Sequence, residues 1–191
     1  MRKIILSLHT TLDGFVAGPN GEMDWIKLDD EMFDLIGGFT ENADTALYGR
    51  VTWEMMDNYW PTAAEKPNAT KHDIEHSKWY NNTQKVVLSR TVKGHKNKTS
   101  FLEDNILSEI EKLKNQPGKN ILIFGSPSAA HALMEHNLID EYWLFINPIL
   151  LGKGIPVFAK IITRIGLQLV TSKTFANGVI ALHYIVEGVI S

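Results

Sequence analysis

The fold is decided by one stretch of sequence, Asn120-Ile121-Leu122-Ile123-Phe124-Gly125-Ser126-Pro127-Ser128. Its apolar run over residues 121–124 predicts a short strand, and Gly125 predicts the turn that ends this strand. The segment from about residue 128 to residue 135 then predicts a helix. A strand, a glycine turn and a helix in this order are typical of a parallel α/β sheet.

The same order recurs in the first two thirds of the chain. Strands are predicted over residues 4–8, 45–48 and 85–89. Helices are predicted with residues 29–31 as an acidic first turn, after Gly49, and from residue 106 to just before Pro117. Residues 58–70 contain two prolines and predict a long loop that covers part of the protein.

The last third changes character. Strands are predicted over residues 141–146, 167–175 and 179–186, and Asn177-Gly178 predicts a type I′ hairpin turn between the last two. We therefore predict an α/β fold with a mostly parallel sheet that is finished by a C-terminal antiparallel hairpin. No repeat or linker interrupts the sequence, so a single domain over residues 1–191 is expected.

Composition excludes several classes of protein. The chain has 191 residues, with 19 Lys and Arg against 22 Asp and Glu, so its formal net charge is −3 and favours neither nucleic acid nor an anionic membrane as partner. The absence of cysteine excludes disulfides, thiolate zinc sites and thiol nucleophiles. No apolar run reaches the roughly 20 residues of a membrane span, and no signal-peptide pattern is present, so a cytoplasmic location is expected.

Three segments could hold a ligand, because open α/β sheets bind ligands at the carboxyl ends of their strands. They are residues 48–53, 88–91 and 124–128, and each joins a predicted strand to a turn rich in glycine, hydroxyl groups or arginine. Such groups bind phosphate. Taken singly, each segment is more typical of an ordinary helix start, and it is the three together that favour a ligand; Arg50 or Arg90 could form a surface salt bridge instead.

Other chemistries lack their motifs. The sequence has neither the Gly-x-Gly-x-x-Gly fingerprint after its first strand nor a Walker A loop, and Ser126 and Ser128 are not in a Gly-x-Ser-x-Gly elbow, which disfavours a hydrolase. His72 and His76 stand one helical turn apart without a clear third ligand. We expect them on a solvated helix face and expect no metal site.

Taken in order, several segments resemble the dihydrofolate reductase superfamily, and most closely its bacterial branch related to the C-terminal reductase domain of the riboflavin-biosynthesis deaminase/reductase. The resemblance covers nearly the whole chain and is carried by residues 7–18, Met23-Asp24-Trp25, residues 47–54, residues 87–90, residues 123–126, residues 138–141 and residues 147–158. It implies a three-layer fold with helices on both faces of the sheet.

The resemblance also implies that the cofactor is NADPH. The residues expected to contact the nicotinamide ring are His9, Val16 and Ala17. Those expected on the phosphates and the adenosine are Gly49, Arg50, Thr52, Leu88, Ser89 and Arg90. Those expected in the glycine-rich turn beneath the diphosphate are Phe124, Gly125, Ser126 and Ser128. Members of the family usually carry two glycines where this chain has Gly125-Ser126, so the Cβ of Ser126 affects affinity more than location.

By resemblance, the catalytic acid aligns with Glu31, and Asp30 is its neighbour in register. The residues expected on the substrate side are Trp25, Leu28 and Leu35, whose apolar surroundings would raise the pKa of a carboxyl. The alternative is that these acids only favour a helix N-terminus.

The resulting hypothesis is an NADPH-dependent oxidoreductase that transfers a hydride to a small heterocyclic or carbonyl substrate and forms a homodimer. One candidate reaction is that of 5-amino-6-(5-phosphoribosylamino)uracil reductase in riboflavin biosynthesis. The chain contains no zinc-binding deaminase segment with His and Cys, so we expect a stand-alone relative with a substrate of its own. A non-catalytic NADP(H)-binding module is the alternative from another class. Dihydrofolate reductase is disfavoured because Trp25-Ile26-Lys27-Leu28 lacks the family's proline.

Overall fold

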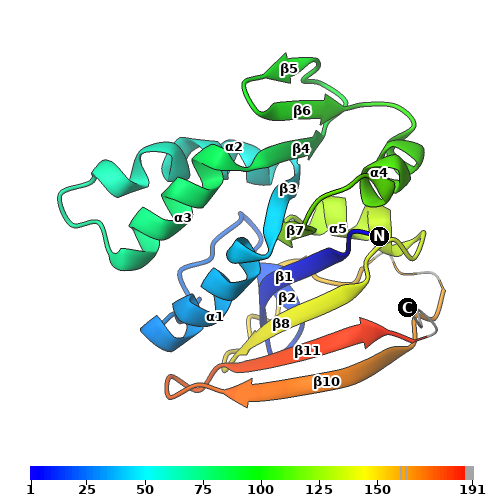
Figure 1. Cartoon of the computed structure of the whole chain (residues 1–191). Coiled ribbons are helices and arrows are strands. Elements are labelled where there is room, and N and C mark those ends of the chain that lie inside the picture. The colour runs from blue at the N-terminus through cyan, green and yellow to red at the C-terminus, as the bar shows by residue number, and fades with distance from the viewer. Residues whose placement is uncertain (160, 162, 188–191) are drawn as a thin grey trace. The chain divides into compact units, whose positions relative to one another are not determined.

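The computed structural model describes residues 1–159, 161 and 163–187 (Figure 1). The chain folds into two compact units. Unit 1 comprises Met1–Arg2 and Asp30–Leu122, and unit 2 comprises Lys3–Asp29 and Ile123–Ser191. A single domain over residues 1–191 stays a prediction.

Unit 1 is an α/β unit in which helices follow strands. Its elements are α1 (Asp30–Glu41), β3 (Ala43–Gly49), α2 (Arg50–Tyr59), the 3-10 helix η1 (Trp60–Glu65), α3 (Lys71–Asn82), β4 (Gln84–Leu88), β5 (His95–Lys96), β6 (Thr99–Leu102), α4 (Ile106–Asn115) and the start of β7 (Asn120–Phe124). β3 pairs parallel with both β4 and β7, β6 pairs parallel with β4, and β5 pairs antiparallel with β6. The parallel sheet predicted for this part is confirmed.

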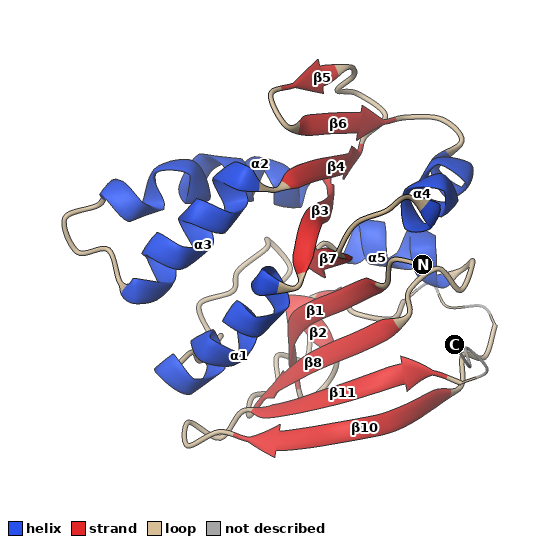
Figure 2. Ribbon diagram, viewed as in Figure 1, coloured by secondary structure: helices blue, strands red, loops and turns tan. Residues whose placement is uncertain are grey.

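The core of unit 1 follows from its apolar strands. Ala46, Leu47 and Tyr48 of β3 are fully buried, because both faces of a parallel strand are covered. Figure 2 shows α1, α2 and α3 gathered beside β3 and β4, with α4 apart from them. The helices α1 and α2 contact β3, and α3 packs mainly on η1.

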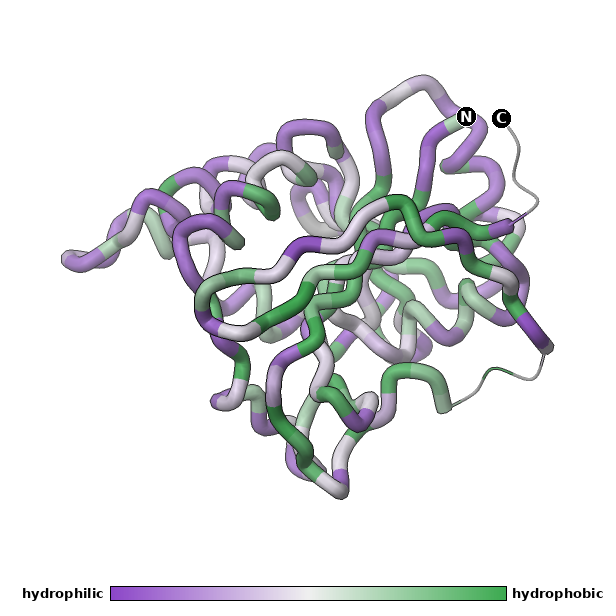
Figure 3. The backbone as a smooth tube through the Cα atoms, turned by 90° about the horizontal axis from the view of Figure 1, so that it is seen from below, coloured by the Kyte–Doolittle hydropathy of each residue, from purple (hydrophilic) through white to green (hydrophobic). Residues whose placement is uncertain are grey.

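Unit 2 contains the antiparallel end of the fold. Its elements are β1 (Ile4–Thr11), β2 (Phe15–Ala17), the end of β7, α5 (Pro127–Met134), β8 (Glu141–Asn147), β9 (Ile155–Pro156), β10 (Leu167–Thr174) and β11 (Ile180–Val186). β1 and β8 pair parallel, whereas β11 pairs antiparallel with both β8 and β10. β2 and β9 form a small separate ribbon. The predicted C-terminal hairpin is therefore confirmed. Figure 3 colours the backbone by hydropathy and shows hydrophobic and hydrophilic stretches that alternate along it.

The predicted turn type of this hairpin was wrong. Phe175 and Val179 close the turn with a backbone hydrogen bond of 2.9 Å, and the Gly178 amide donates to the Phe175 carbonyl. The loop therefore has three residues, and only Gly178 has a positive φ, of 87°, whereas a type I′ turn needs a positive φ at Asn177 too. The Asn177 side chain instead accepts a hydrogen bond from the Val179 amide at 3.0 Å.

The loop predicted over residues 58–70 is shorter than expected. The helix α2 continues to Tyr59, and η1 follows with Pro61 at its start, where the missing amide of proline costs no hydrogen bond. Thr70 then begins α3 with a capping box, in which its hydroxyl accepts from the Asp73 amide and the Asp73 carboxylate accepts from the Thr70 amide.

The expectation of a solvated face for His72 and His76 was also wrong. The His72 ring stacks on Phe33 of α1 with centroids 4.0 Å apart, and the His76 ring lies 4.0 Å from Trp60 of η1. His76 is 6% exposed, and burial lowers its pKa to about 3. These histidines join α1, η1 and α3 through ring contacts.

This burial makes the stability of the protein sensitive to acid. The pKa of His76 is lower in the folded than in the unfolded chain, so the unfolded chain binds more protons between about pH 6.5 and pH 3. The free energy of unfolding should therefore fall as the pH drops through this range, by up to about 1.4 kcal/mol per pH unit for this group. In urea titrations at pH 7 and pH 4.5, His76→Gln should lose less stability than the wild type. His136→Gln, which changes an exposed histidine, is the control, and an equal loss in both variants would contradict the assignment.

Candidate active site

In unit 1, the register of β3 and β4 brings two sequence-predicted segments together. Gly49 is paired with Leu88, so both strands end at the same edge of the sheet. Beyond this edge lie Arg50, which begins α2, and Ser89-Arg90, which follow β4. The sequence-predicted contacts of the cofactor's phosphates and adenosine are thus neighbours in this unit.

The N-terminus of α2 is suited to an anion. Its N-cap is Gly49, no side chain caps its free amides, and its first turn contains no acidic residue. Thr52 lies in this turn and is half-buried. Free amide groups and the positive end of the helix dipole together attract phosphate.

The Arg50 guanidinium has a partner of its own. Its Nη1 lies 2.6 Å and 2.8 Å from the two carboxylate oxygens of Glu54, one helical turn further along α2. Both side chains are about 40% exposed, so the ion pair contributes little to stability. The salt bridge considered from the sequence therefore exists, and a phosphate would compete with Glu54 for Arg50.

Ser89 and Arg90 differ in their surroundings. The Ser89 hydroxyl is buried and accepts hydrogen bonds from the amides of Thr91 (3.2 Å) and Val92 (2.9 Å), so it shapes the turn after β4. Arg90 is exposed, and the described part of the chain offers its guanidinium no ion pair or hydrogen bond. Arg90 is therefore available to an anionic ligand, whereas Ser89 positions the backbone that carries it.

In unit 2, the turn after β7 has an unusual backbone. The Gly125 amide donates to the Ser7 carbonyl at 2.9 Å, and Gly125 and Ser126 both have left-handed φ values, of 63° and 54°. Ser126 is 2% exposed and is the N-cap of α5, and Ser128 is exposed in the first turn. A non-glycine residue pays about 1–2 kcal/mol for this conformation. A glycine at this position would avoid that cost.

His9, which is expected beside the nicotinamide, is held in unit 2 by a ring contact and a hydrogen-bond contact. Its ring stacks on Phe145 of β8 with centroids 4.9 Å apart, and its Nδ1 lies 3.3 Å from the amide nitrogen of Asn147. Burial lowers the pKa of His9 to about 4, so the ring is neutral at pH 7. A neutral imidazole can orient a ligand but is a poor proton donor.

Asn147 is the residue that the sequence reasoning missed. It is fully buried, its amide nitrogen also donates to the Phe145 carbonyl at 3.1 Å, and its oxygen accepts from the Lys27 amide at 2.9 Å. It thereby ties the 25–28 segment, which carries Trp25 and the 47%-exposed Leu28, to the end of β8. The sequence does mark Asn147, because Asn147-Pro148 ends an apolar strand. The contacts of the Asn147 side chain, however, depend on tertiary structure and could not be predicted.

Val16 and Ala17 are buried in β2, which is held by its ribbon with β9. Gly154 is required before β9, because a Cβ there would collide with the Ala17 carbonyl oxygen and the Phe15 ring. Phe124 ends β7 directly before the Gly125 turn and is half-buried.

Asp30 and Glu31, the predicted acids, occupy the first turn of α1 and are exposed. The inward face of α1 carries Met32 and Ile36, and Leu35 is half-buried. The catalytic role of these carboxylates stays a prediction.

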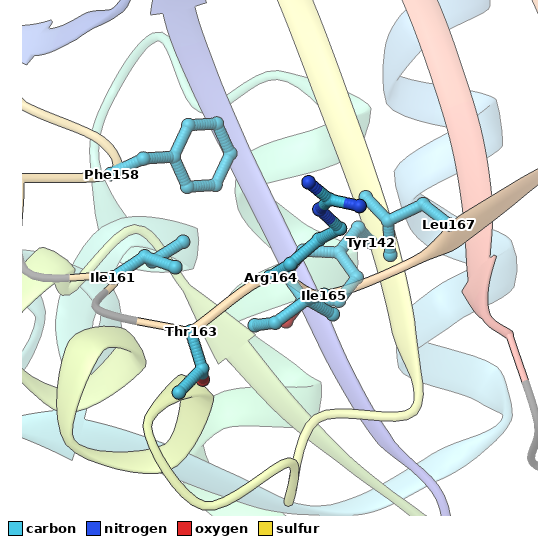
Figure 4. Close-up of a pocket in the computed structure, with 7 residues that line it drawn as sticks. All are labelled: Tyr142, Phe158, Ile161, Thr163, Arg164, Ile165 and Leu167. Atoms are coloured by element: carbon cyan, nitrogen blue, oxygen red, sulfur yellow. The ribbon is translucent and has the colours of Figure 1, made fainter.

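A small pocket in unit 2 is separate from these residues. It has a volume of about 220 Å³ and is lined by Tyr142, Phe158, Ile161, Thr163, Arg164, Ile165 and Leu167 (Figure 4). Tyr142 lies near the amino end of β8, five residues before Asn147, and alternation puts these two side chains on opposite faces of the strand. This pocket therefore plays no part in the cofactor hypothesis.

Two further observations concern the described residues only. They contain no group of three or more acidic or histidine side chains arranged to hold a metal ion. None of the helices formed by residues 1–159 and 163–187 has the length and apolar character that a bilayer crossing requires.

Comparison with known proteins identifies the family. A model described as the RibD C-terminal domain matches residues 2–181. The Bacillus subtilis protein YyaP is 40% identical over 188 residues, which cover 96% of this chain and 94% of YyaP. The riboflavin biosynthesis protein RibD of Corynebacterium ammoniagenes is 24% identical over 84% of this chain but only 47% of its own length.

Solved structures support the same fold. A putative riboflavin biosynthesis protein from Shewanella sp. PV-4 aligns with a TM-score of 0.72 at 22% identity, covering 98% of this chain and 99% of the other. A deaminase and 5-amino-6-(5-phosphoribosylamino)uracil reductase from Thermotoga maritima aligns with a TM-score of 0.69 at 16% identity over 97% of this chain and 56% of its own. The α/β fold expected from the dihydrofolate reductase resemblance is thus confirmed, and the chain belongs to the RibD C-terminal domain family.

Proposed function

We propose that this protein is an NADPH-dependent reductase of a small heterocyclic or carbonyl substrate. The observation that carries the proposal is the edge of unit 1, where the uncapped N-terminus of α2, Arg50 and Arg90 lie beyond two paired strand ends. These donors suit the phosphates of a dinucleotide better than any neutral ligand. Membership of the RibD C-terminal domain family and the absence of membrane-spanning helices among the described residues are consistent with a reductase that works in the cytoplasm.

The roles of the chain's own groups follow from their chemistry. Arg90 binds a phosphate group, and so does Arg50 once its ion pair with Glu54 is broken. The backbone amides at the start of α2 orient the phosphate. In unit 2, His9 and Asn147 offer a neutral, hydrogen-bonded surface of the kind that positions a nicotinamide or substrate ring. When bound, NADPH supplies the hydride. Since His9 is neutral at pH 7, the proton comes from another group, for which Glu31 and Asp30 remain our candidates.

Turnover tests the proposal against the alternative of a binding module. The purified protein should quench or enhance NADPH fluorescence on binding, and one of a panel of ribosylaminopyrimidines, pterins and carbonyl compounds should then cause loss of cofactor absorbance. The panel includes 5-amino-6-(5-phosphoribosylamino)uracil and dihydrofolate, so that each candidate reaction is covered. Binding without oxidation would favour the binding module, and absence of binding would contradict both functions.

Arg50 and Glu54 provide a sharper test of the phosphate edge. Arg50→Ala should weaken NADPH binding at least tenfold and NADH binding much less, because only NADPH carries the additional phosphate. Glu54→Gln, which removes the competing carboxylate and keeps the side chain's size, should leave NADPH affinity unchanged or tighten it a few-fold. Dissociation constants come from fluorescence titration at fixed ionic strength. Equal losses for both cofactors in Arg50→Ala would exclude Arg50 from this role.

We also propose a homodimer that forms through the outer strand of unit 2. The residues of β10 are mostly exposed, and Leu169 and Val170 are each 51% exposed. Exposed apolar side chains on a strand with unpaired backbone groups favour association with a second copy.

Oligomeric state in solution tests this surface. The wild type should have the mass of a dimer in sedimentation experiments, and Leu169→Lys should shift it towards the monomer. Thr171→Lys is the matched control, because Thr171 is exposed on the same strand but pairs with His183, on the opposite face from Leu169. A wild type that is monomeric at all concentrations, or a control that dissociates equally, would contradict the proposal.

A further inference from the structure

Unit 1 contains a polar pocket at the opposite end of its sheet from Arg50 and Arg90. It has a volume of about 480 Å³ and is lined by Asp57, Pro61, Tyr80, Asn81, Lys85, Asn97, Lys98 and Thr99. Lys85 is the second residue of β4 and is paired with Thr99, the first residue of β6. Lys85 lies four residues before Ser89, roughly 13 Å along the strand, so this pocket is distinct from the phosphate edge.

The central group of this pocket is the Lys85 ammonium. The residue is 6% exposed, its Nζ donates to the Thr83 carbonyl at 3.0 Å, and the same Nζ lies 4.4 Å from the centroid of the Tyr80 ring. An ammonium has three N–H donors, so one carbonyl and one ring face leave a donor without an acceptor among the described residues. No carboxylate of the described residues forms an ion pair with Lys85, and Asp57 in the same pocket acts on it only through its charge.

The carboxylate whose charge acts on Lys85 is that of Asp57, and it already has a hydrogen-bond partner. Asp57 accepts a hydrogen bond from the Tyr80 hydroxyl at 3.2 Å. Its charge raises the pKa of Lys85, but burial lowers that pKa more strongly and the nearby Lys98 lowers it further. The lining thus contains two cations and one carboxylate, and its formal charge is +1.

The rest of the lining consists of hydrogen-bonding groups. The Asn81 side-chain amide donates a hydrogen bond to the Pro61 carbonyl at 3.0 Å, which leaves its oxygen as an acceptor, and Asn97 and Thr99 also line the pocket. Lys98 donates to the Asn82 carbonyl at 3.0 Å and is otherwise exposed. Such a lining matches an oxyanion that carries further hydroxyl groups, and it offers little to an apolar ligand.

We propose that this pocket binds a small polar metabolite through an oxyanion, a carboxylate or a phosphate group, which lies between Lys85 and Lys98. The oxyanion accepts a hydrogen bond from the remaining Lys85 donor and forms the ion pair with Lys85 that Asp57 does not form. The hydroxyl groups of the ligand contact Asn81 and Thr99. This site is independent of the proposed reductase activity, because it needs neither NADPH nor the residues that would bind it.

Ligand-induced thermal stabilisation tests the proposal in the full chain. Ribose 5-phosphate and inorganic phosphate probe a phosphate group, and gluconate and acetate probe a carboxylate. Because Arg50 and Arg90 also attract anions, the titrations are made in the wild type and in the double variant Arg50→Ala/Arg90→Ala. We expect the melting temperature of the double variant to rise saturably with at least one polyhydroxylated probe. Whether the phosphate probes or the carboxylate probes raise it more identifies the anionic group that the pocket binds.

Lys85→Met keeps the length of the side chain and removes its charge, and it should weaken the effective probe at least tenfold in the double-variant background. Lys78→Met, an exposed lysine of α3 outside the pocket, is the matched control and should respond like its parent. Should Lys85→Met fail to fold, the ¹⁵Nζ signal of Lys85 in the parent gives a second readout, which should shift on addition of the probe. No response to any probe in the double variant, or an unchanged response in folded Lys85→Met, would overturn the proposal.

Discussion

The parallel pairing of β3 with β4 is the constraint on which the candidate site in unit 1 depends. Its register sets Gly49 opposite Leu88, so the chain leaves both strands at the same level. A slip of one residue would move every side chain of β4 to the other face and would bury Lys85 against different neighbours. This register is well specified because both strands carry buried apolar side chains, of which Leu47 and Val87 are fully buried.

That register sets two cationic side chains at the two ends of one strand. At the carboxyl end of β4, Arg90 is exposed and faces solvent beside the α2 N-terminus. At the amino end, Lys85 is buried beneath the Tyr80 ring. An exposed arginine binds an anion at little desolvation cost, whereas a buried lysine gains more from an anion because its own charge is poorly solvated. The two cationic sites therefore differ in what a ligand must offer.

Much of this architecture could be predicted from the sequence. Strands with continuous apolar residues, such as β7, and helices with clear periodicity, such as α4, lie where the pattern placed them. The ribbon of β2 with β9 could not be found, because strands of two or three residues have no periodicity and one of them contains Pro156. The hairpin turn was misjudged because Asn177-Gly178 fits both a two-residue and a three-residue loop, and only the Phe175–Val179 hydrogen bond decides between them.

The candidate site was predictable only in part, and the reason is physical. Local sequence marks helix starts and strand ends, so Gly49, Arg50 and Arg90 could be proposed together. It does not mark contacts between different elements of the fold, such as that of His9 with Phe145 and Asn147, or that of His76 with Trp60. Those contacts decide that both histidines are neutral at pH 7. Neither His9 nor His76 therefore offers a positive charge to an anionic ligand, and in unit 1 that attraction rests on arginine and lysine side chains such as Arg90 and Lys85.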